Sequence, residues 1–232
     1  EYFLVSCAIR DIIRRFAKTK KSFTKFPSAV AIQLNDTHPA LAIVELMRIL
    51  IDENGLSWNT AWKITHSTFG YTNHTLLPEA MEKWPLALFE RILPRHLQII
   101  FDINERFLGK IRSRWPGDID RQAKMSVIEE GNTKHVRMAN LSIIGSSSVN
   151  GVAALHSKLI TSDLVPEFYE MMPEKFNNKT NGITQRRWLL KINPGLSSLI
   201  SERIGDGWIT DLFKLRGLEG TIGDKAFYER VR

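Results

Sequence analysis

Apolar side chains recur at helical spacing along most of this sequence, with charged and polar side chains between them. The segment from Tyr2 to Phe16 shows the pattern clearly, because its apolar positions fall about three or four residues apart. Pro39 is favourable in the first turn of a helix, and Ser57 is favourable as the N-cap residue of the next helix. We predict further helices at residues 39–55, 58–67, 80–84, 86–92, 95–115, 118–125, 152–161, 164–172, 185–192, 194–204, 208–215 and from 224 onward.

The run Ala29–Leu34 instead indicates a buried strand, because it is short, mostly apolar and rich in residues that favour strands. It leads directly into the polar residues 35–38, Asn-Asp-Thr-His. In open α/β sheets, ligands bind at the carboxyl ends of the strands. The sequence therefore predicts a binding crevice there, and residues 135–144 indicate a second strand.

The alternation of helices with a few strands predicts a helix-rich α/β fold. A chain of 232 residues can bury one large core or two modest ones. The stretch Phe176–Gly182 is polar and ends in glycine, as a domain boundary does. We therefore predict two domains, residues 1–180 and 181–232.

Charge and cysteine content narrow the class of protein. The formal net charge of +7 fits either an anionic partner or a piece of a protein whose acidic neighbours lie elsewhere. The single cysteine, Cys7, excludes an internal disulfide and fits a reducing compartment.

No apolar run reaches the roughly 20 residues that cross a bilayer, so we expect no membrane partner. Both ends of the sequence read as the inside of a helix, and we expect a piece of a longer polypeptide.

Four clusters of polar residues stand where the predicted elements break: residues 35–38, 71–75, 145–151 and 177–182. None has the spacing of a zinc site, a nucleophile elbow or a phosphate-binding glycine loop. Neutral hydrogen-bonding groups around a crevice suit a sugar, whose hydroxyls need many oriented partners. Taken singly, each histidine in these clusters is more often a structural residue and each Asn-Gly pair is usually a turn.

Taken together and in order, these segments closely resemble the α-glucan (glycogen or starch) phosphorylase family. The resemblance runs almost from end to end and covers a middle portion of such an enzyme. The residues that carry it are 1–3, 11–16, 31–39, 71–75, 77–80, 93–100, 149–153, 178–184 and 186–189.

The resemblance implies a fragment of a two-domain glycosyltransferase of the GT-B type, with Rossmann-like domains around a deep cleft. Such enzymes transfer the terminal α-1,4-linked glucose of a glucan to orthophosphate and release α-glucose 1-phosphate. They bind pyridoxal phosphate through a lysine of the C-terminal domain, and that lysine motif lies outside this chain. The cofactor phosphate, rather than its ring, exchanges a proton with the substrate phosphate. The resemblance also implies a homodimer in the cytoplasm, or in a plastid.

The resemblance assigns a role to five residues of the sugar site. His74 lies against the glucosyl unit, with its ring at the 6-hydroxyl and its backbone carbonyl facing the charge of the oxocarbenium-like transition state. Asn181 is the second partner of the 6-hydroxyl, and Val152 lines the same pocket. Asp36 and His38 match residues on the glucan acceptor side.

Three departures from the family pattern limit what can be transferred. Ser147 stands where the family usually has histidine, which removes a polar contact expected near the sugar. Arg14 and Arg15 match a pair that holds a nucleotide phosphate in allosterically regulated members, but the segment 17–28 is shorter than in those members. Without the cofactor lysine, the 232 residues alone are not expected to turn over.

Two other functions remain open from the sequence. One is a truncated, catalytically inactive fragment that keeps part of a sugar crevice. The other is nucleic-acid binding, which rests on net charge alone. No segment interleaves basic and aromatic residues as nucleic-acid-binding surfaces do, so we expect no nucleic-acid partner.

Overall fold

The computed structural model describes residues 1–19 and 21–231. They cluster into two compact units, Glu1–Thr180 and Asn181–Arg232. Which domains of a longer enzyme these two units represent stays a prediction.

The first unit is built on a parallel sheet of four short strands in the order β1-β2-β6-β7. The strands are β1 Ile32–Asn35, β2 Phe69–Thr72, β6 Ser148–Gly151 and β7 Phe176–Asn178. All neighbouring pairs are parallel, and the register aligns Asn35 with Thr72, Thr72 with Asn150, and Asn150 with Asn177. The four carboxyl ends therefore lie at one edge of the sheet.

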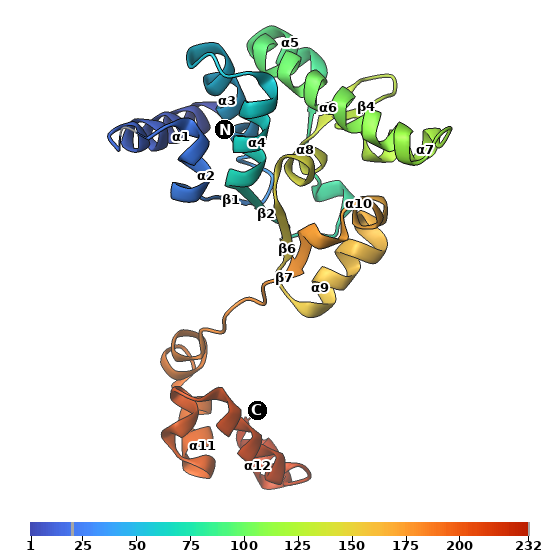
Figure 1. Ribbon diagram of the computed structural model, residues 1–232. Coiled ribbons are helices and arrows are strands. Elements are labelled where there is room, and N and C mark those ends of the chain that lie inside the picture. Colours follow the sequence, from blue (N-terminus) through green and yellow to red (C-terminus); the bar gives the residue numbers. More distant parts are fainter. Residues whose placement is uncertain (20, 232) are drawn as a thin grey trace. The chain divides into compact units, whose positions relative to one another are not determined.

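Helices surround this sheet, with α1 to α4 on one side of it in Figure 1 and α9 and α10 on the other. A second, antiparallel sheet has the order β3-β5-β4, with β3 Lys83–Pro85, β4 Ile128–Glu129 and β5 His135–Arg137. The α-helices of the first unit are α1 Tyr2–Ala17, α2 Phe26–Ala29, α3 Leu41–Arg48, α4 Trp58–Thr68, α5 Leu86–Ile92, α6 Pro94–Arg114, α7 Ile119–Met125, α8 Met138–Gly145, α9 Ala154–Leu159 and α10 Pro166–Met171. Its 3₁₀ and π segments are η1 Phe23–Lys25, η2 Ile49–Glu53, η3 Pro78–Ala80, η4 Ile160–Leu164 and η5 Pro173–Lys175.

The core of the first unit lies between the sheet and helices α3, α6 and α8. Helix α8 is buried along its whole length, and α3 is buried from Leu41 to Met47. Full burial of one large aliphatic side chain contributes about 1.5–3 kcal/mol. The sheet therefore sits on a rigid base, which positions the polar residues at its edge.

The second unit is small and contains η6 Arg186–Lys191, α11 Pro194–Ile204, η7 Asp206–Ile209, η8 Leu212–Thr221 and α12 Lys225–Val231. Trp208 is fully buried at its centre, and the indole N–H donates to Ser201 Oγ at 3.1 Å. Helix α11 begins where predicted, after Asn193, whose side chain caps the helix by accepting from the Leu196 N–H.

The prediction of a helix-rich α/β fold is confirmed, and the structure adds that the main sheet is parallel. The strand predicted at Ala29–Leu34 is present as Ile32–Asn35, while Ala29 instead ends helix α2. Two assignments were wrong. Residues 80–84, predicted as helix, instead lead into strand β3 and include its first two residues, and residues 135–144, predicted as strand, become helix after Arg137. Strands β2, β6 and β7 were not predicted. None of the helices described is both long and apolar enough to cross a membrane.

Candidate active site

The polar residues that follow the four parallel strands lie together at the carboxyl edge of the sheet. The backbone ladder continues one step beyond the strands, with Asp36 N–H donating to Thr72 O at 3.0 Å, Asn73 N–H to Asn150 O at 3.0 Å, and Lys179 N–H to Gly151 O at 3.1 Å. Residues directly after these bonds are therefore held in register. The expected crevice at the end of β1 thus extends along β2, β6 and β7.

A row of side-chain hydrogen bonds crosses the strands just before this edge. The Gln33 amide donates to Thr72 Oγ1 at 2.9 Å, and the Thr72 hydroxyl donates to Asn150 Oδ1 at 2.9 Å. Gly70 is the residue of β2 opposite Gln33 and leaves no space for a larger residue, since a Cβ there would lie 2.5 Å from Gln33 Oε1. The row ties β1, β2 and β6 together and fixes the spacing of the residues beyond them.

His74 projects from the segment after β2 and is exposed. Its Nε2 lies 2.5 Å from Asn35 Oδ1, so the ring donates to the amide oxygen from the neighbouring strand. This leaves Nδ1 as the acceptor in the neutral imidazole. No described N–H donates to the His74 carbonyl. The ring is therefore oriented by one bond, with its other nitrogen and its backbone oxygen free for a ligand.

Asp36 makes the turn at the end of β1 in the left-handed region, with a φ of 72°. Such a backbone costs a non-glycine residue about 1–3 kcal/mol and is often found at functional sites. The carboxylate Oδ1 accepts the Thr37 N–H at 2.6 Å and the Thr37 hydroxyl at 3.2 Å, which holds the turn. The single proton of the Thr37 hydroxyl is shared between Asp36 and Glu82, whose Oε2 is the nearer acceptor at 2.8 Å.

His38 is exposed beside two carboxylates, with Nδ1 at 3.4 Å from Glu1 Oε1 and at 3.8 Å from Glu82 Oε1. Burial raises the pKa of Glu1, and the negative charge of Glu82 raises that pKa further. Among the residues described, this trio is the group whose ligand atoms, within 4.8 Å of one another, could hold a metal ion. Exposed acidic groups are common without a metal, and we assign none.

Val152 follows β6, and its backbone N–H is held by His156, a residue that was not predicted to belong to the site. Its N–H donates to His156 Nδ1 at 3.0 Å, so the proton of that ring is on Nε2. This Nε2 is buried without a partner among the described residues. Burial lowers the pKa of His156, and the nearby His74 lowers it further. The one indication of this contact in the sequence was a histidine four residues after Val152, in the first turn of α9.

Gly151 allows this arrangement, because a Cβ at that position would lie 2.4 Å from Ser157 Oγ and 2.9 Å from His156 Nδ1. The Ser157 hydroxyl donates to Asn178 Oδ1 at 2.9 Å, which connects α9 to the end of β7. Asn181 belongs to the second unit. Its place at the sugar site stays a prediction.

The other predicted residues lie outside this edge. Arg14 and Arg15 are on the exposed side of α1, where both pair with Asp11 at 2.6 and 2.9 Å. The hydrogen bond from Arg14 holds the pKa of Asp11 below its usual value. Ser147 precedes β6, and its hydroxyl donates to the Phe69 carbonyl at 3.1 Å. It therefore lies at the amino edge of the sheet, where it leaves the polar network at the carboxyl edge intact.

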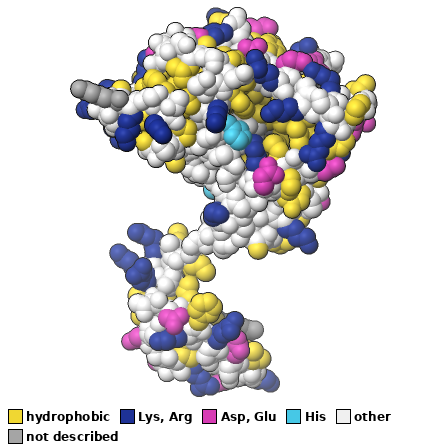
Figure 2. Space-filling model, in the orientation of Figure 1, with side chains coloured by type: hydrophobic (Ala, Val, Ile, Leu, Met, Phe, Trp, Pro, Cys, Tyr) yellow, Lys and Arg dark blue, Asp and Glu magenta, His cyan; other side chains and the backbone are white. Residues whose placement is uncertain are grey.

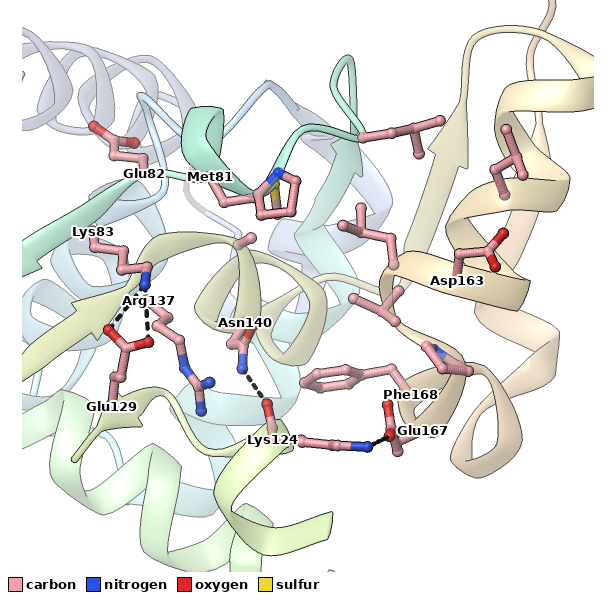
Figure 3. Close-up of a pocket in the computed structure, with 17 residues that line it drawn as sticks. Met81, Glu82, Lys83, Lys124, Glu129, Arg137, Asn140, Asp163, Glu167 and Phe168 are labelled. Carbon is pink, nitrogen blue, oxygen red and sulfur yellow. Dashed lines mark hydrogen bonds and ion pairs between the residues drawn. The ribbon is translucent and has the colours of Figure 1, made fainter. Parts of the chain in front are cut away.

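A hollow of about 760 Å³ opens in the same unit, but of the side chains that make the contacts described in this section, only Glu82 lines it. Figure 3 shows two ion pairs among its charged groups, Lys83 with Glu129 at 2.9 Å and Lys124 with Glu167 at 2.7 Å, while the Asn140 amide donates to the Lys124 carbonyl. Arg137, also in the lining, donates to the Ser126 carbonyl. The polar residues at the ends of the parallel strands, which the sequence analysis singled out, are not among the residues that line this hollow. We therefore place the candidate site at the strand ends.

The parallel sheet, its covering helices and the polar carboxyl edge define an α/β protein of the class that binds small polar ligands at the strand ends. The family model of carbohydrate phosphorylases matches residues 1–232. Brain-form glycogen phosphorylase of Bos taurus is 55% identical over 239 aligned residues, which cover 100% of this chain and 28% of the bovine protein. The brain form of Rattus norvegicus is 54% identical and the muscle form of Bos taurus 53% identical, with the same coverage. The chain therefore belongs to the carbohydrate phosphorylase family, and it spans about 28% of the length of these relatives.

Proposed function

We propose that the full-length protein containing this chain is an α-glucan phosphorylase, a hexosyltransferase that acts on glycogen or starch. The bond from C1 of the terminal glucose to the next sugar breaks, and a bond from C1 to a phosphate oxygen forms. The proton of the phosphate passes to the released 4-hydroxyl oxygen, and α-glucose 1-phosphate leaves. Family membership and the strand-end site around His74 support this proposal.

The orientation of His74 is the observation that supports this reaction most directly. Because Asn35 holds Nε2, the free Nδ1 can accept the 6-hydroxyl of the glucosyl unit. We propose that the free His74 carbonyl stabilises the positive charge that develops at C1. Preorganised dipoles of this kind are usually the largest single contribution in such sites. Val152, Asn181, Asp36 and His38 complete the proposed glucose and acceptor contacts.

Pyridoxal phosphate, the cofactor implied by the family, would supply proton exchange with the substrate phosphate. The buried lysine of the described residues is Lys175, and its ammonium donates to the Ile143 and Ile144 carbonyls, at the amino edge of the sheet. That lysine cannot present the cofactor to His74. We therefore assign the cofactor to residues outside these 232 and derive no step through it.

The larger architecture belongs to the same proposal. The two compact units would be the C-terminal part of the N-terminal Rossmann-like domain and the start of the C-terminal, cofactor-binding domain of a GT-B-type enzyme. We propose a homodimer in the cytoplasm or a plastid. Arg14 and Arg15 stay the proposed candidates for a nucleotide phosphate; both are exposed on α1 and pair with Asp11.

The test is phosphate-dependent release of glucose 1-phosphate from glycogen by the full-length protein. Changing His74→Ala should reduce kcat by at least about a hundredfold, the usual effect of removing one such electrostatic contact. His135→Ala, a histidine in β5, is the matched control and should keep full activity. The alternative, an inactive sugar-binding fragment, predicts glycogen binding without any product in the wild-type protein.

A further inference from the structure

A second hollow, of about 420 Å³, lies at the opposite edge of the parallel sheet from the candidate site. His66 and Ser67 precede β2, Ile144 precedes β6, and Lys175 precedes β7, and all four line it. A four-residue strand spans about 13 Å, so this hollow is separate from the strand-end site. Its volume is within the range of about 300–1,000 Å³ that small-molecule sites occupy.

Four basic side chains line this hollow: Lys63, Arg106, Lys110 and Lys175. The lining contains no carboxylate, and in the described part of the chain none of the four forms an ion pair. Elsewhere in this unit, basic residues such as Lys83 and Lys124 do pair with glutamates. Part of the net positive charge is therefore gathered, uncompensated, around one cavity. Lysine and arginine side chains lie exposed on the face seen in Figure 2, with a histidine among them.

Lys175 is the most constrained of the four. It is buried, and its ammonium donates to the Ile143 and Ile144 carbonyls at 3.0 and 3.4 Å, which leaves one proton without a described acceptor. Burial lowers the pKa of Lys175 to about 8, with Glu174 raising and Lys110 lowering it. Burial likewise lowers the pKa of His66 to about 4, and Lys175 and Lys110 lower it further. An anion in the hollow would offset this crowding of positive charge.

The walls of the hollow are flat and apolar. Trp58 and Trp62 stack with ring centroids 5.5 Å apart, and the guanidinium carbon of Arg106 lies 3.9 Å from the centroid of the Trp58 ring. The Trp58 indole N–H is buried and has no acceptor among the described residues. Phe107, Met171 and Met172 complete the lining, and aromatic and thioether groups of this kind pack well against a planar ring.

We propose that this hollow binds a small organic phosphate with a flat, apolar body. A phosphate monoester carries a charge of about −1.5 to −2 at pH 7 and has three acceptor oxygens. It can therefore bind several cations at once, which a single carboxylate does less well. The ring would lie against Trp62 and Phe107, and the phosphate would face Lys63, Lys110 and Lys175. The site is independent of the proposed phosphorolysis, because it shares no residue with the strand-end site.

Phenyl phosphate is the probe, titrated into the full-length protein by calorimetry. The double variant Lys63→Gln, Lys110→Gln should bind it about tenfold more weakly or worse, because each charged hydrogen bond contributes strongly. The matched control is Lys21→Gln, Lys25→Gln, which removes two exposed lysines elsewhere on the same unit and should bind normally. Phenol and inorganic phosphate, which each lack one half of the ligand, should bind more weakly than phenyl phosphate.

Lysine acylation followed by mass spectrometry locates the bound probe and separates this site from a phosphate-binding active site. Phenyl phosphate should protect Lys63 and Lys110 from acylation and leave Lys21 and Lys25 unprotected. Equal binding by both double variants, or equal acylation of Lys63 and Lys110 with and without the probe, would overturn the proposal. Phenol binding as tightly as phenyl phosphate would also overturn it. Glucose 1-phosphate release by the Lys63→Gln, Lys110→Gln variant should stay at the wild-type rate.

Discussion

The imidazole Nε2 of His74 lies 2.5 Å from the side-chain oxygen of Asn35, although 39 residues separate them in the chain. Asn35 is the last residue of β1 and His74 follows the neighbouring parallel strand β2, so the register of the two strands brings both residues to the same edge. A single hydrogen bond between two strand ends therefore sets the direction in which His74 presents its second nitrogen.

Replacing Asn35 tests whether this bond matters. In Asn35→Ala the ring loses its acceptor and rotates more freely, and displacement of a positioning group by about 1 Å can reduce the rate a hundredfold. We expect kcat for phosphorolysis to fall about tenfold to a hundredfold, with a smaller change in the KM for glycogen. Gln98→Ala, on the exposed side of α6, is the control and should leave kcat unchanged. A normal kcat in Asn35→Ala would show that the bond does not orient a reacting group.

Gly151 is predicted to be essential for packing. A Cβ in Gly151→Ala would lie 2.4 Å from Ser157 Oγ and 2.9 Å from His156 Nδ1, so α9 must move away from the sheet. Overpacking of this kind costs about 1–3 kcal/mol. We expect a lower melting temperature and a lower rate of phosphorolysis. Adding Ser157→Ala should restore only part of the melting temperature and part of the rate, because His156 Nδ1 and the Ser157 Cα, at 2.9 Å, still obstruct the methyl group.

The matched control for this glycine is Gly195→Ala in α11, where no atom lies within 4 Å of the added Cβ. It should melt at or slightly above the wild-type temperature. If Gly151→Ala behaved like Gly195→Ala, the close approach of α9 to the end of β6 would not hold in solution.

Glu45 is a buried carboxylate that stabilises the core of the first unit. It accepts from His96 Nε2 at 2.7 Å, from Arg48 at 2.9 and 3.0 Å, and from Ser6 Oγ at 3.0 Å. Burial alone would raise the pKa of Glu45, but these hydrogen bonds outweigh it and lower the pKa to about 2. We expect Glu45→Gln to lose about 3 kcal/mol, because it leaves the half-buried guanidinium of Arg48 without its carboxylate.

The pH dependence follows from the sign of this shift. The folded pKa lies below the ordinary value of 4.5, so the stabilisation is complete above about pH 4.5 and is lost as the pH falls towards 2. The difference in melting temperature between wild type and Glu45→Gln should therefore shrink over that range. Glu90→Gln, an exposed glutamate on α5, should show no such difference. A gap between wild type and Glu45→Gln that is constant from pH 5 to pH 2 would contradict the prediction.

Lys175 should make stability rise with pH as well, but on the alkaline side. Its folded pKa of about 8 lies below the ordinary 10.5, so the unfolded chain holds the proton longer and stability rises between these two pH values. That difference corresponds to about 3 kcal/mol at about 1.4 kcal/mol per pH unit. Lys175→Met should lack this rise, which melting temperatures of both proteins from pH 7 to pH 10.5 would reveal. Parallel curves for the two proteins would show that Lys175 keeps an ordinary pKa.

Local signals in the sequence were sufficient where a helix had one apolar face or a capping residue. Tyr2–Ala17 has such a face, Ser57 caps α4 by accepting from the Thr60 N–H, and Asp118 caps α7 by accepting from the Arg121 N–H. The same reasoning failed for α8, since its eight buried residues show no polar side and resemble a buried strand. Strand β3 was missed because only its pairing with β5 makes it a strand.

The sequence by itself determined the family, the helix-rich α/β class and the polar clusters that could bind a sugar, because these depend on residue type and local spacing. Only the tertiary structure decided that the carboxyl ends of β1, β2, β6 and β7 share one edge, since the parallel pairing of short polar strands is a long-range property. It also revealed His156 behind Val152 and gathered four unpaired cations at the opposite edge. Contacts between residues far apart in the chain arise from backbone register and burial, and no single segment encodes them.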